Sequence, residues 1–350
     1  MIRFIQNVIL FIISFGLVIL IISYFGDAGA LFYKKNNYES VAKNLLNNKF
    51  VFIRGNIDER LLQKEIILNL NILPETIVLG SSRVMQLSQN ISQSKSLINN
   101  GVSGCSIEDI AAIINLYETK FNTLPKNIVL GLDPWSLNIN NEQKRYYSIL
   151  KYYKNFFSYS DDQIKEDEFE ITQKEIFQLF NPSFFSSSLK SFLSFRNPIS
   201  ISDTFISGKS CRLPDLSIMY DKSYNNPTHQ QLESEVKKYL KSPIYSIENF
   251  SKIDDFKLNE LRKIIKHLIF KKCMVTIVLS PYHQRVYNFI SNNFLYKNVV
   301  ESEKVYKQIA KDYNIILKGS FNPNLLHVRE EDFLDGMHIN KETIEDIFLR

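Results

Sequence analysis

Hydrophobic residues form one long run at the N-terminus and short, separate runs in the rest of the chain. From Phe4 to Phe25 the sequence is almost wholly apolar, which is long enough for a helix that crosses a bilayer. Arg3 and the amino terminus precede the run, and their positive charge favours a cytoplasmic N-terminus. We therefore predict a single-pass membrane anchor over residues 1–30, with the remaining chain outside the cytoplasm.

Two other interpretations of this run stay open. Ala28-Gly29-Ala30 is typical of a signal-peptidase site, so the run can instead be a cleaved signal peptide, although it exceeds the usual length of one. Lys34 and Lys35 lie on the far side of the run and weaken the predicted orientation. The third interpretation is a buried first helix in a cytosolic, lipase-like enzyme.

Beyond residue 74, short apolar runs alternate with amphipathic helical patterns. Such alternation predicts a parallel sheet covered on both faces, a three-layer α/β/α fold with a flavodoxin-like sheet. The ends of its strands are the expected place for a site. The predicted strands are Thr76–Leu79, Ser96–Ile98, Asn127–Leu132, Met274–Leu279 and Asn314–Leu317, and the predicted helices are Ile107–Phe121, Lys257–Phe270 and Val299–Tyr313.

Two segments interrupt this rhythm. Residues 31–74 form a polar, helix-rich connector, and residues 140–250 are rich in Tyr, Phe, Ser, Asn and Lys, which predicts a largely helical insertion in a domain of residues 75–350. The insertion is where substrate choice is expected. Its aromatic clusters either line a groove for a sugar or lipid or pack a helical subdomain; they are Tyr146-Tyr147, Tyr152-Tyr153, Phe156-Phe157 and Phe184-Phe185-Ser186-Ser187-Ser188.

Composition narrows the class of protein. The 350 residues, 45% of them hydrophobic, can bury one substantial core with an appendage. The net charge of +5 is scattered, without an arginine-rich stripe, so we expect no nucleic-acid partner. Cys105, Cys211 and Cys273 have no metal-like spacing, and we predict neither a metal, a cofactor nor a disulfide framework.

Two distant segments carry candidate chemistry. Gly80-Ser81-Ser82-Arg83 follows a predicted strand and precedes the helix-compatible stretch Val84–Leu87, so a serine hydroxyl would lie at the sheet edge beside helix amides that favour an oxyanion. Asp335-Gly336-Met337-His338 places a carboxylate where it can orient an imidazole. The alternatives are structural: Ser82 as a helix cap, Asp335 as another, and His338 as an ordinary histidine.

Four segments in order resemble the SGNH (GDSL-like) hydrolase superfamily. They are Val78–Arg83, Asn99–Gly104, Val129–Trp135 and Asp335–His338. The resemblance is to the membrane-anchored branch near the D-alanyl transfer protein of teichoic acids and the alginate acetylation proteins. It spans roughly residues 75 to 345, with the insertion outside it.

The resemblance implies roles for individual residues. Ser82 is the nucleophile, His338 the general base and Asp335 its orienting partner, while Ser82 and Gly104 supply oxyanion-hole amides. Asp133 stands where the family has an asparagine that donates to the oxyanion. An ionised carboxylate would repel that charge, so Asp133 must be protonated, turned away or doing other work.

Two further residues are candidate substrate contacts. His283 follows the predicted strand Met274–Leu279 on the same sheet edge as Ser82. Arg83 either steers an anionic group or pairs with an acidic neighbour. His229, His267 and His327 lack partners in the sequence and are expected to be structural.

These observations lead to one main expectation and one alternative. The first is a membrane-anchored, extracytoplasmic serine acyltransferase or esterase that acts on a cell-envelope polysaccharide or its lipid-linked precursor. If it transfers acyl groups, a multi-spanning membrane acyltransferase is the expected partner. The alternative is a non-catalytic, membrane-tethered binding or assembly protein of the same fold, which Asp133 favours.

Overall fold

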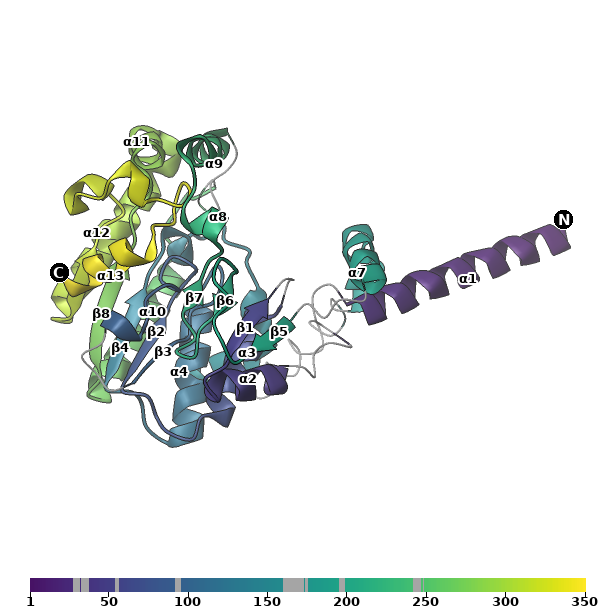
Figure 1. The fold of residues 1–350 in the computed structure, drawn as a ribbon, viewed down its shortest axis with the longest axis horizontal. Coiled ribbons are helices and arrows are strands. Elements are labelled where there is room, and N and C mark those ends of the chain that lie inside the picture. Colours follow the sequence, from purple (N-terminus) through teal and green to yellow (C-terminus); the bar gives the residue numbers. More distant parts are fainter. Residues whose placement is uncertain are drawn as a thin grey trace.

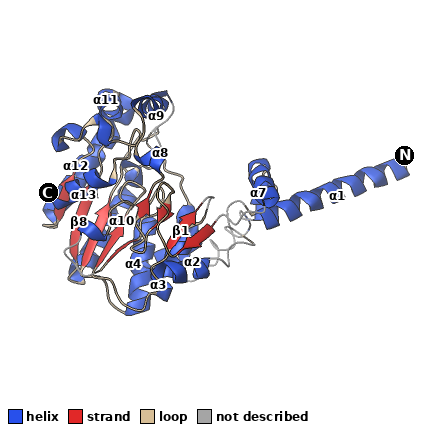
Figure 2. Ribbon diagram, viewed as in Figure 1, coloured by secondary structure: helices blue, strands red, loops and turns tan. Residues whose placement is uncertain are grey.

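A computed structural model describes most of the chain. The described residues are 1–27, 32, 38–53, 57–91, 96–159, 173, 176–194, 199–241, 247 and 249–350. The possible cleavage site at Ala28-Gly29-Ala30, and Lys34 and Lys35, lie outside them. The fold is mixed α/β, with one apolar helix that projects from the N-terminal side (Figure 1; Figure 2).

The centre of the molecule is a five-stranded parallel sheet in the order β3-β2-β4-β8-β9. When these strands are counted along the chain the order is 2-1-3-4-5, which is the flavodoxin-like arrangement. Strands β2 and β8 have the predicted bounds, whereas β9 begins two residues later than predicted. The strands are β2 (Thr76–Leu79), β3 (Leu97–Asn99), β4 (Asn127–Gly131), β8 (Met274–Leu279) and β9 (Ile316–Gly319).

Helices cover both faces of this sheet. Helices α4 (Ile107–Phe121), α10 (Asp255–Phe270) and α12 (Lys297–Asp312) connect strands that advance in the same direction, so right-handed crossovers place them on one face. Helix α13 (Lys341–Leu349) contacts the short helix η2 (Gln89–Ile91) on the other face. The core between the layers is built from the apolar strand residues and the inner helix faces.

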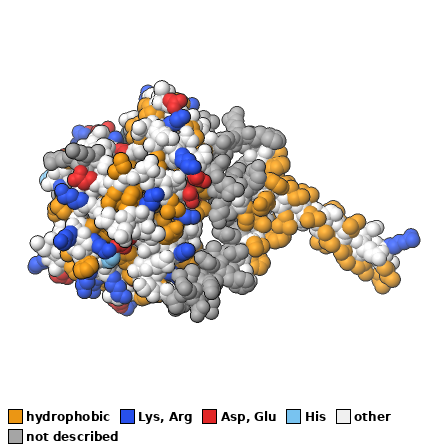
Figure 3. All heavy atoms as spheres, turned by 90° about the horizontal axis from the view of Figure 1, so that it is seen from below, with side chains coloured by type: hydrophobic (Ala, Val, Ile, Leu, Met, Phe, Trp, Pro, Cys, Tyr) orange, Lys and Arg blue, Asp and Glu red, His pale blue; other side chains and the backbone are white. Residues whose placement is uncertain are grey.

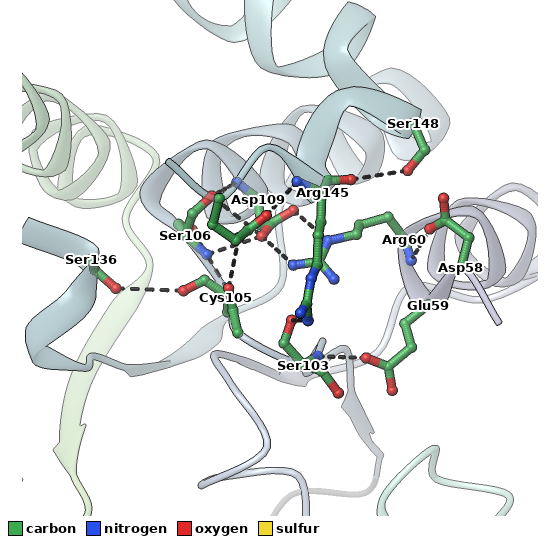
Figure 4. Close-up of polar contacts among 12 residues, drawn as sticks. Asp58, Glu59, Arg60, Ser103, Cys105, Ser106, Asp109, Ser136, Arg145 and Ser148 are labelled. Atoms are coloured by element: carbon green, nitrogen blue, oxygen red, sulfur yellow. Dashed lines mark hydrogen bonds and ion pairs between the residues drawn. The ribbon is translucent and has the colours of Figure 1, made fainter. Parts of the chain in front are cut away.

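The predicted connector is part of the folded domain. Helices α2 (Tyr38–Leu46) and α3 (Glu59–Asn69) enclose a second hydrophobic cluster. Arg60 of α3 donates two hydrogen bonds of 2.8 and 2.9 Å to Asp109 of α4, and both side chains are buried (Figure 4). This bidentate pair fixes α3 on the main domain, because separating it would leave two buried charges.

The structure contains a second sheet, which was not predicted from the sequence. Strand β1 (Phe50–Ile53) of the connector pairs antiparallel with β5 (Ile199–Ser202) and β6 (Cys211–Arg212), and β6 pairs with β7 (Ile218–Met219). The insertion is largely helical, as predicted, but it also contains these three short strands, which were not predicted. The partners of β1 are about 150 residues away, so no local pattern in either segment revealed the pairing.

The other described elements of the insertion are helical. They are η4 (Arg145–Ile149), α5 (Leu150–Phe157), α7 (Pro182–Ser194), α8 (Lys222–Asn225) and α9 (His229–Lys241). Aromatic rings of residues 146–159 pack against one another, with Tyr153 and Phe157 at 5.5 Å and Phe156 and His267 at 5.0 Å between ring centroids. The clusters between Tyr146 and Phe157 therefore pack a subdomain against α4, as the second interpretation expected, whereas the Phe184–Ser188 cluster lies in α7, which contacts α1.

Helix α1 (Ile2–Gly26) is long and apolar enough to cross a membrane. Its hydrophobic side chains are exposed along most of its length, and Figure 3 shows them on the projecting helix. A helix that is apolar on all sides and is not covered by protein favours a lipid environment.

Candidate active site

Ser82 lies in a tight turn at the carboxyl end of β2. Gly80 has a φ of +151°, and a Cβ there would come within 2.7 Å of Val84 Cγ2 and 2.8 Å of the Gly131 carbonyl oxygen. Only glycine fits this close approach of the turn to β4. The turn itself is closed by a hydrogen bond from the Val84 amide to the Ser81 carbonyl.

The helix expected after Ser82 is absent. Residues 82–86 form turns, and two of their carbonyl groups, those of Val84 and Met85, accept hydrogen bonds from distant residues. The Asn99 side chain donates to the carbonyls of Val84 and Leu87, and the Ile218 amide donates to that of Met85. Any oxyanion stabilisation at Ser82 therefore comes from single amides and not from a helix dipole.

The Asp335–His338 segment is a closed turn. One carboxylate oxygen of Asp335 accepts hydrogen bonds from the amides of Met337 and His338, both at 2.8 Å. Phe333 and Ile339 flank the turn, are buried, and form an antiparallel bridge. Asp335 thus stabilises its own turn, and the N-cap of α13 is Asn340 instead.

The fold brings the two distant segments together. Ser82 Oγ lies 2.9 Å from Nε2 of His338, and Nδ1 of the same ring lies 2.8 Å from Oδ2 of Asp335. Burial alone would raise the pKa of Asp335, but His338, the Met337 amide and Tyr224 hold the pKa well below its ordinary value. The ionised carboxylate orients the ring so that Nε2 faces the serine hydroxyl, the arrangement needed for a general base.

Two backbone amides remain available beside this triad. Gly104 has a φ of +60°, and within the described part of the chain neither its amide nor that of Ser82 donates a hydrogen bond to the protein. The loop of Gly104 is held from outside: Gln143 donates to the Gly104 carbonyl at 2.8 Å, and Arg145 donates to the Ser103 carbonyl (Figure 4). Unpaired amides are the usual donors to an oxyanion.

Asp133 and Arg83 form a buried ion pair. The guanidinium donates to Asp133 Oδ1 at 2.9 Å, to the Met337 carbonyl at 3.1 Å, and to the Ser280 carbonyl. Its carbon also lies 4.2 Å from the centroid of the Tyr282 ring. Arg83 therefore joins the serine turn to β8 and to the histidine turn.

The ion pair between Arg83 and Asp133 determines the charge of Asp133 and the availability of Arg83 to a substrate. Burial raises the pKa of Asp133, and the positive charge of Arg83 opposes that rise. We assign the ionised form, because a carboxylate facing a guanidinium at 2.9 Å is favoured as the anion. Asp133 thus supplies no donor to an oxyanion, and Arg83, being buried by protein partners, offers no free guanidinium to a substrate.

His283 has a structural role next to the site. Its side chain is buried and caps α11 (Gln284–Asn292), where Nδ1 accepts from the Arg285 amide at 3.2 Å. Its own amide donates to the Gly336 carbonyl at 3.0 Å. Burial lowers the pKa of the imidazole. His283, which we predicted to contact the substrate, therefore has a structural role: it holds the turn that carries His338.

The insertion contributes residues that sequence reasoning missed. The hydroxyl of Tyr224, in α8, donates to Asp335 Oδ2 at 2.7 Å and lies 3.3 Å from Nδ1 of His338. The ring of Tyr239, in α9, packs so closely on the turn that a Cβ at Gly336 would lie 2.6 Å from it. Nothing in the sequence links these tyrosines to a motif about 100 residues later.

The site has no companion metal centre in the residues that can be described. Over those residues, no three His, Cys, Asp or Glu side chains are placed to share a metal ion. The three cysteines are buried free thiols. Neither family models nor curated protein sequences match this chain.

Proposed function

We propose that the chain is a serine-dependent acyl-transfer enzyme of the SGNH type. The observation that carries the proposal is the continuous hydrogen-bonded chain from Ser82 through His338 to Asp335. Each member lies within normal hydrogen-bonding distance, and the carboxylate has a strongly lowered pKa. An orienting acid, a base and a hydroxyl in this order form the arrangement that activates a serine.

The reaction follows from these contacts. Ser82 Oγ attacks an ester or thioester carbonyl while His338 Nε2 takes its proton, and the Asp335 carboxylate stabilises the charged imidazole. The amides of Ser82 and Gly104 are the donors available to the oxyanion. His338 returns the proton to the departing alcohol or thiol, which leaves an acyl group on Ser82. A second hydroxyl, from water or a sugar, then attacks the acyl carbonyl and gives its proton to His338, which passes that proton to Ser82 Oγ as the acyl–serine bond breaks.

The location of the enzyme is the second part of the proposal. Helix α1 would hold the catalytic domain at the cell membrane, and Arg3 before it favours the extracytoplasmic side for that domain. An anchored enzyme there meets envelope polysaccharides and their lipid-linked precursors. For transferase activity, a multi-spanning membrane acyltransferase would supply the acyl group. Protease added outside intact cells should digest the domain, and full protection would contradict this orientation.

The alternative function is a non-catalytic, membrane-tethered binding or assembly protein. The observation in its favour is the Arg83–Asp133 pair, because it replaces the family's oxyanion-donating asparagine with a side chain that cannot donate. Two amides would then have to stabilise the oxyanion alone. Removing one donor from an oxyanion hole lowers the rate by about 10²- to 10³-fold in a well-studied case. An experiment is therefore needed to distinguish a weakly active enzyme from an inactive binding protein.

A direct test uses the detergent-solubilised full chain and a chromogenic acetyl ester. We expect hydrolysis by the wild type and only the background rate from Ser82→Ala. Labelling by a serine-reactive fluorophosphonate should be lost in Ser82→Ala and kept in Ser81→Ala, its neighbour in the same turn. Equal turnover by wild type and Ser82→Ala would remove Ser82 as the nucleophile, and no labelling of the folded wild type would favour the binding protein.

A further inference from the structure

Helix α7 of the insertion lies against the end of α1 that faces the catalytic domain (Figure 1). The contact is close: a Cβ on Gly26 would lie 2.1 Å from the carbonyl oxygen of Ser188, at the middle of α7. Ser23 and Ser188 are completely buried in this crossing. Small residues at the crossing let the two backbones approach, which is how helices in membranes commonly pack.

The position of this crossing along α1 sets its depth. The 22 residues from Phe4 to Phe25 extend about 33 Å as a helix, which matches a hydrocarbon layer of about 30 Å. If α1 spans the bilayer, Gly26 lies where the hydrocarbon ends. The middle of α7 is then at the level of the lipid headgroups.

Aromatic rings gather at the same level. Tyr24 lies 5.8 Å from Phe32, and Phe32 lies 6.3 Å from Phe184 of α7, measured between ring centroids. The Tyr24 and Phe25 side chains are 42% and 46% exposed. Tyrosine is enriched where membrane meets water, because its ring is apolar and its hydroxyl is wet.

Residues 176–194 also expose large apolar side chains that the protein does not cover. Lys190 is the one charged residue in this stretch of sequence. In water, exposing this many large apolar side chains within one short segment is unfavourable. The exposed side chains are Ile176 (49%), Phe177 (70%), Phe180 (55%), Phe192 (37%) and Leu193 (63%).

We propose that residues 176–194 lie in the membrane interface and bind the lipid bilayer as a second attachment beside α1. The apolar side chains at the two ends of the segment enter the boundary between headgroups and acyl chains, and Lys190 extends toward the headgroups. The inference concerns attachment alone and is independent of whether Ser82 is catalytic. A single spanning helix permits the domain to tilt, whereas a second contact at the end of that helix restricts the tilt.

The test uses three matched leucine positions in the full-length chain. Leu193→Cys in the segment, Leu17→Cys in α1 and Leu325→Cys in η6 (Pro323–Leu326) are each labelled with the environment-sensitive dye NBD, since all three positions are exposed and the native thiols are buried. The labelled proteins are reconstituted as monomers, at low protein-to-lipid ratio, into vesicles of phosphatidylcholine and phosphatidylglycerol. Lipids brominated at shallow or deep acyl positions then report the depth of each dye.

The expected result is a blue-shifted Leu193 dye that shallow bromines quench more than deep ones. The Leu17 dye should be quenched by deep bromines, and the Leu325 dye should resemble one in water. A Leu193 dye that remains in water overturns the proposal, as does one that is dehydrated but not quenched, because it would then be covered by protein. Failure of α1 to insert overturns it too. Phe177→Cys provides a second site if Leu193→Cys does not fold.

Discussion

The hydroxyl of Tyr224 donates to the same carboxylate oxygen of Asp335 that faces the His338 ring. Oδ2 thus receives two hydrogen bonds, while Oδ1 accepts the two backbone amides of the turn. Burial raises the pKa of Tyr224, and the negative charge of Asp335, which a phenolate would face, raises it further. Tyr224 is therefore a donor at all physiological pH values. The insertion completes the acid end of the triad and is not simply attached to the domain.

Replacing Tyr224 by Phe should lower kcat/KM by roughly 10- to 150-fold, because a hydrogen bond to a charged group is worth roughly 1.5–3 kcal/mol. Without this donor, more negative charge remains on Asp335 next to the imidazole, and the imidazolium is stabilised. The acidic limb of the pH–rate profile should then move to higher pH. Profiles measured with a chromogenic ester check this result.

Tyr220 offers a matched control, because the centroid of its ring lies 4.9 Å from that of Tyr224 and both side chains are half-buried. Tyr220→Phe should leave the pH–rate profile in place. If Tyr224→Phe lowers the rate without moving the acidic limb, Tyr224 acts through packing alone.

The sequence predicted the central sheet well for a physical reason. Strands of a parallel sheet are buried on both faces, so Thr76–Leu79 and Met274–Leu279 appear as continuous apolar runs with clear ends. The end of β9 was less clear, because its residues are only partly buried and its polar Lys318 and Gly319 follow the apolar positions.

The candidate site was only partly predictable. Ser82 was predicted because it lies in a local motif at a strand end, and Asp335 and His338 because they form a local motif after the last strand. The role of Arg83 stayed open between two interpretations, and only the fold shows its partner Asp133, 50 residues away. Tyr224 and Tyr239 have no local signature, since their importance arises from packing between the insertion and the histidine turn. Local sequence patterns identify the candidate catalytic residues, whereas the residues that position them are identified only by tertiary contacts.

The buried Arg83–Asp133 pair should be necessary for stability. Asp133→Asn introduces the amide side chain of the family that the chain resembles, but it leaves the guanidinium buried without a counter-charge. Breaking such a pair typically costs about 3–5 kcal/mol, so we expect Asp133→Asn to lower the free energy of unfolding by that order and not to raise esterase activity. Chemical denaturation measures the first quantity, and the chromogenic assay measures the second.

An ion pair on the protein surface serves as the control for the buried Arg83–Asp133 pair. Glu301 and Lys304 are paired at 3.0 Å on the surface of α12, and Glu301→Gln should change stability by less than about 1 kcal/mol. The double variant Arg83→Met/Asp133→Asn should be less destabilised than the sum of the single variants, because it removes both charges. Additive losses would show that the two side chains act separately.

Glu260 should make stability depend on pH. Burial raises its pKa to about 7, while the Tyr153 hydroxyl, which donates at 2.7 Å, opposes the rise. Between the ordinary carboxyl value of 4.5 and about 7, the folded protein holds a proton that the unfolded chain has lost. This contribution is therefore fully present below pH 4.5 and is lost as the pH rises through 7. Its size is roughly 3 kcal/mol.

Glu260→Gln keeps an acceptor for Tyr153 and cannot ionise. Its free energy of unfolding should fall less steeply than that of the wild type between pH 4.5 and 7, as measured by denaturation at several pH values. Glu342→Gln, at an exposed position in α13, should retain the wild-type slope. An unchanged slope in Glu260→Gln would assign the pH dependence to other groups.

The contact between Gly336 and Tyr239 predicts a compensating pair of substitutions. A methyl group at Gly336 would meet the Tyr239 ring at 2.6 Å, so Gly336→Ala must displace either α9 or the turn that carries His338. Overpacking of this kind costs about 1–3 kcal/mol, and the displacement should lower kcat/KM as well. In a Tyr239→Ala background the added methyl has space, and both losses should shrink. Thermal unfolding and ester hydrolysis of the four variants measure this coupling, with Gly16→Ala, which meets no atom within 4 Å, as the neutral glycine control. If Gly336→Ala costs the same in both backgrounds, the insertion does not set the position of His338 through Tyr239.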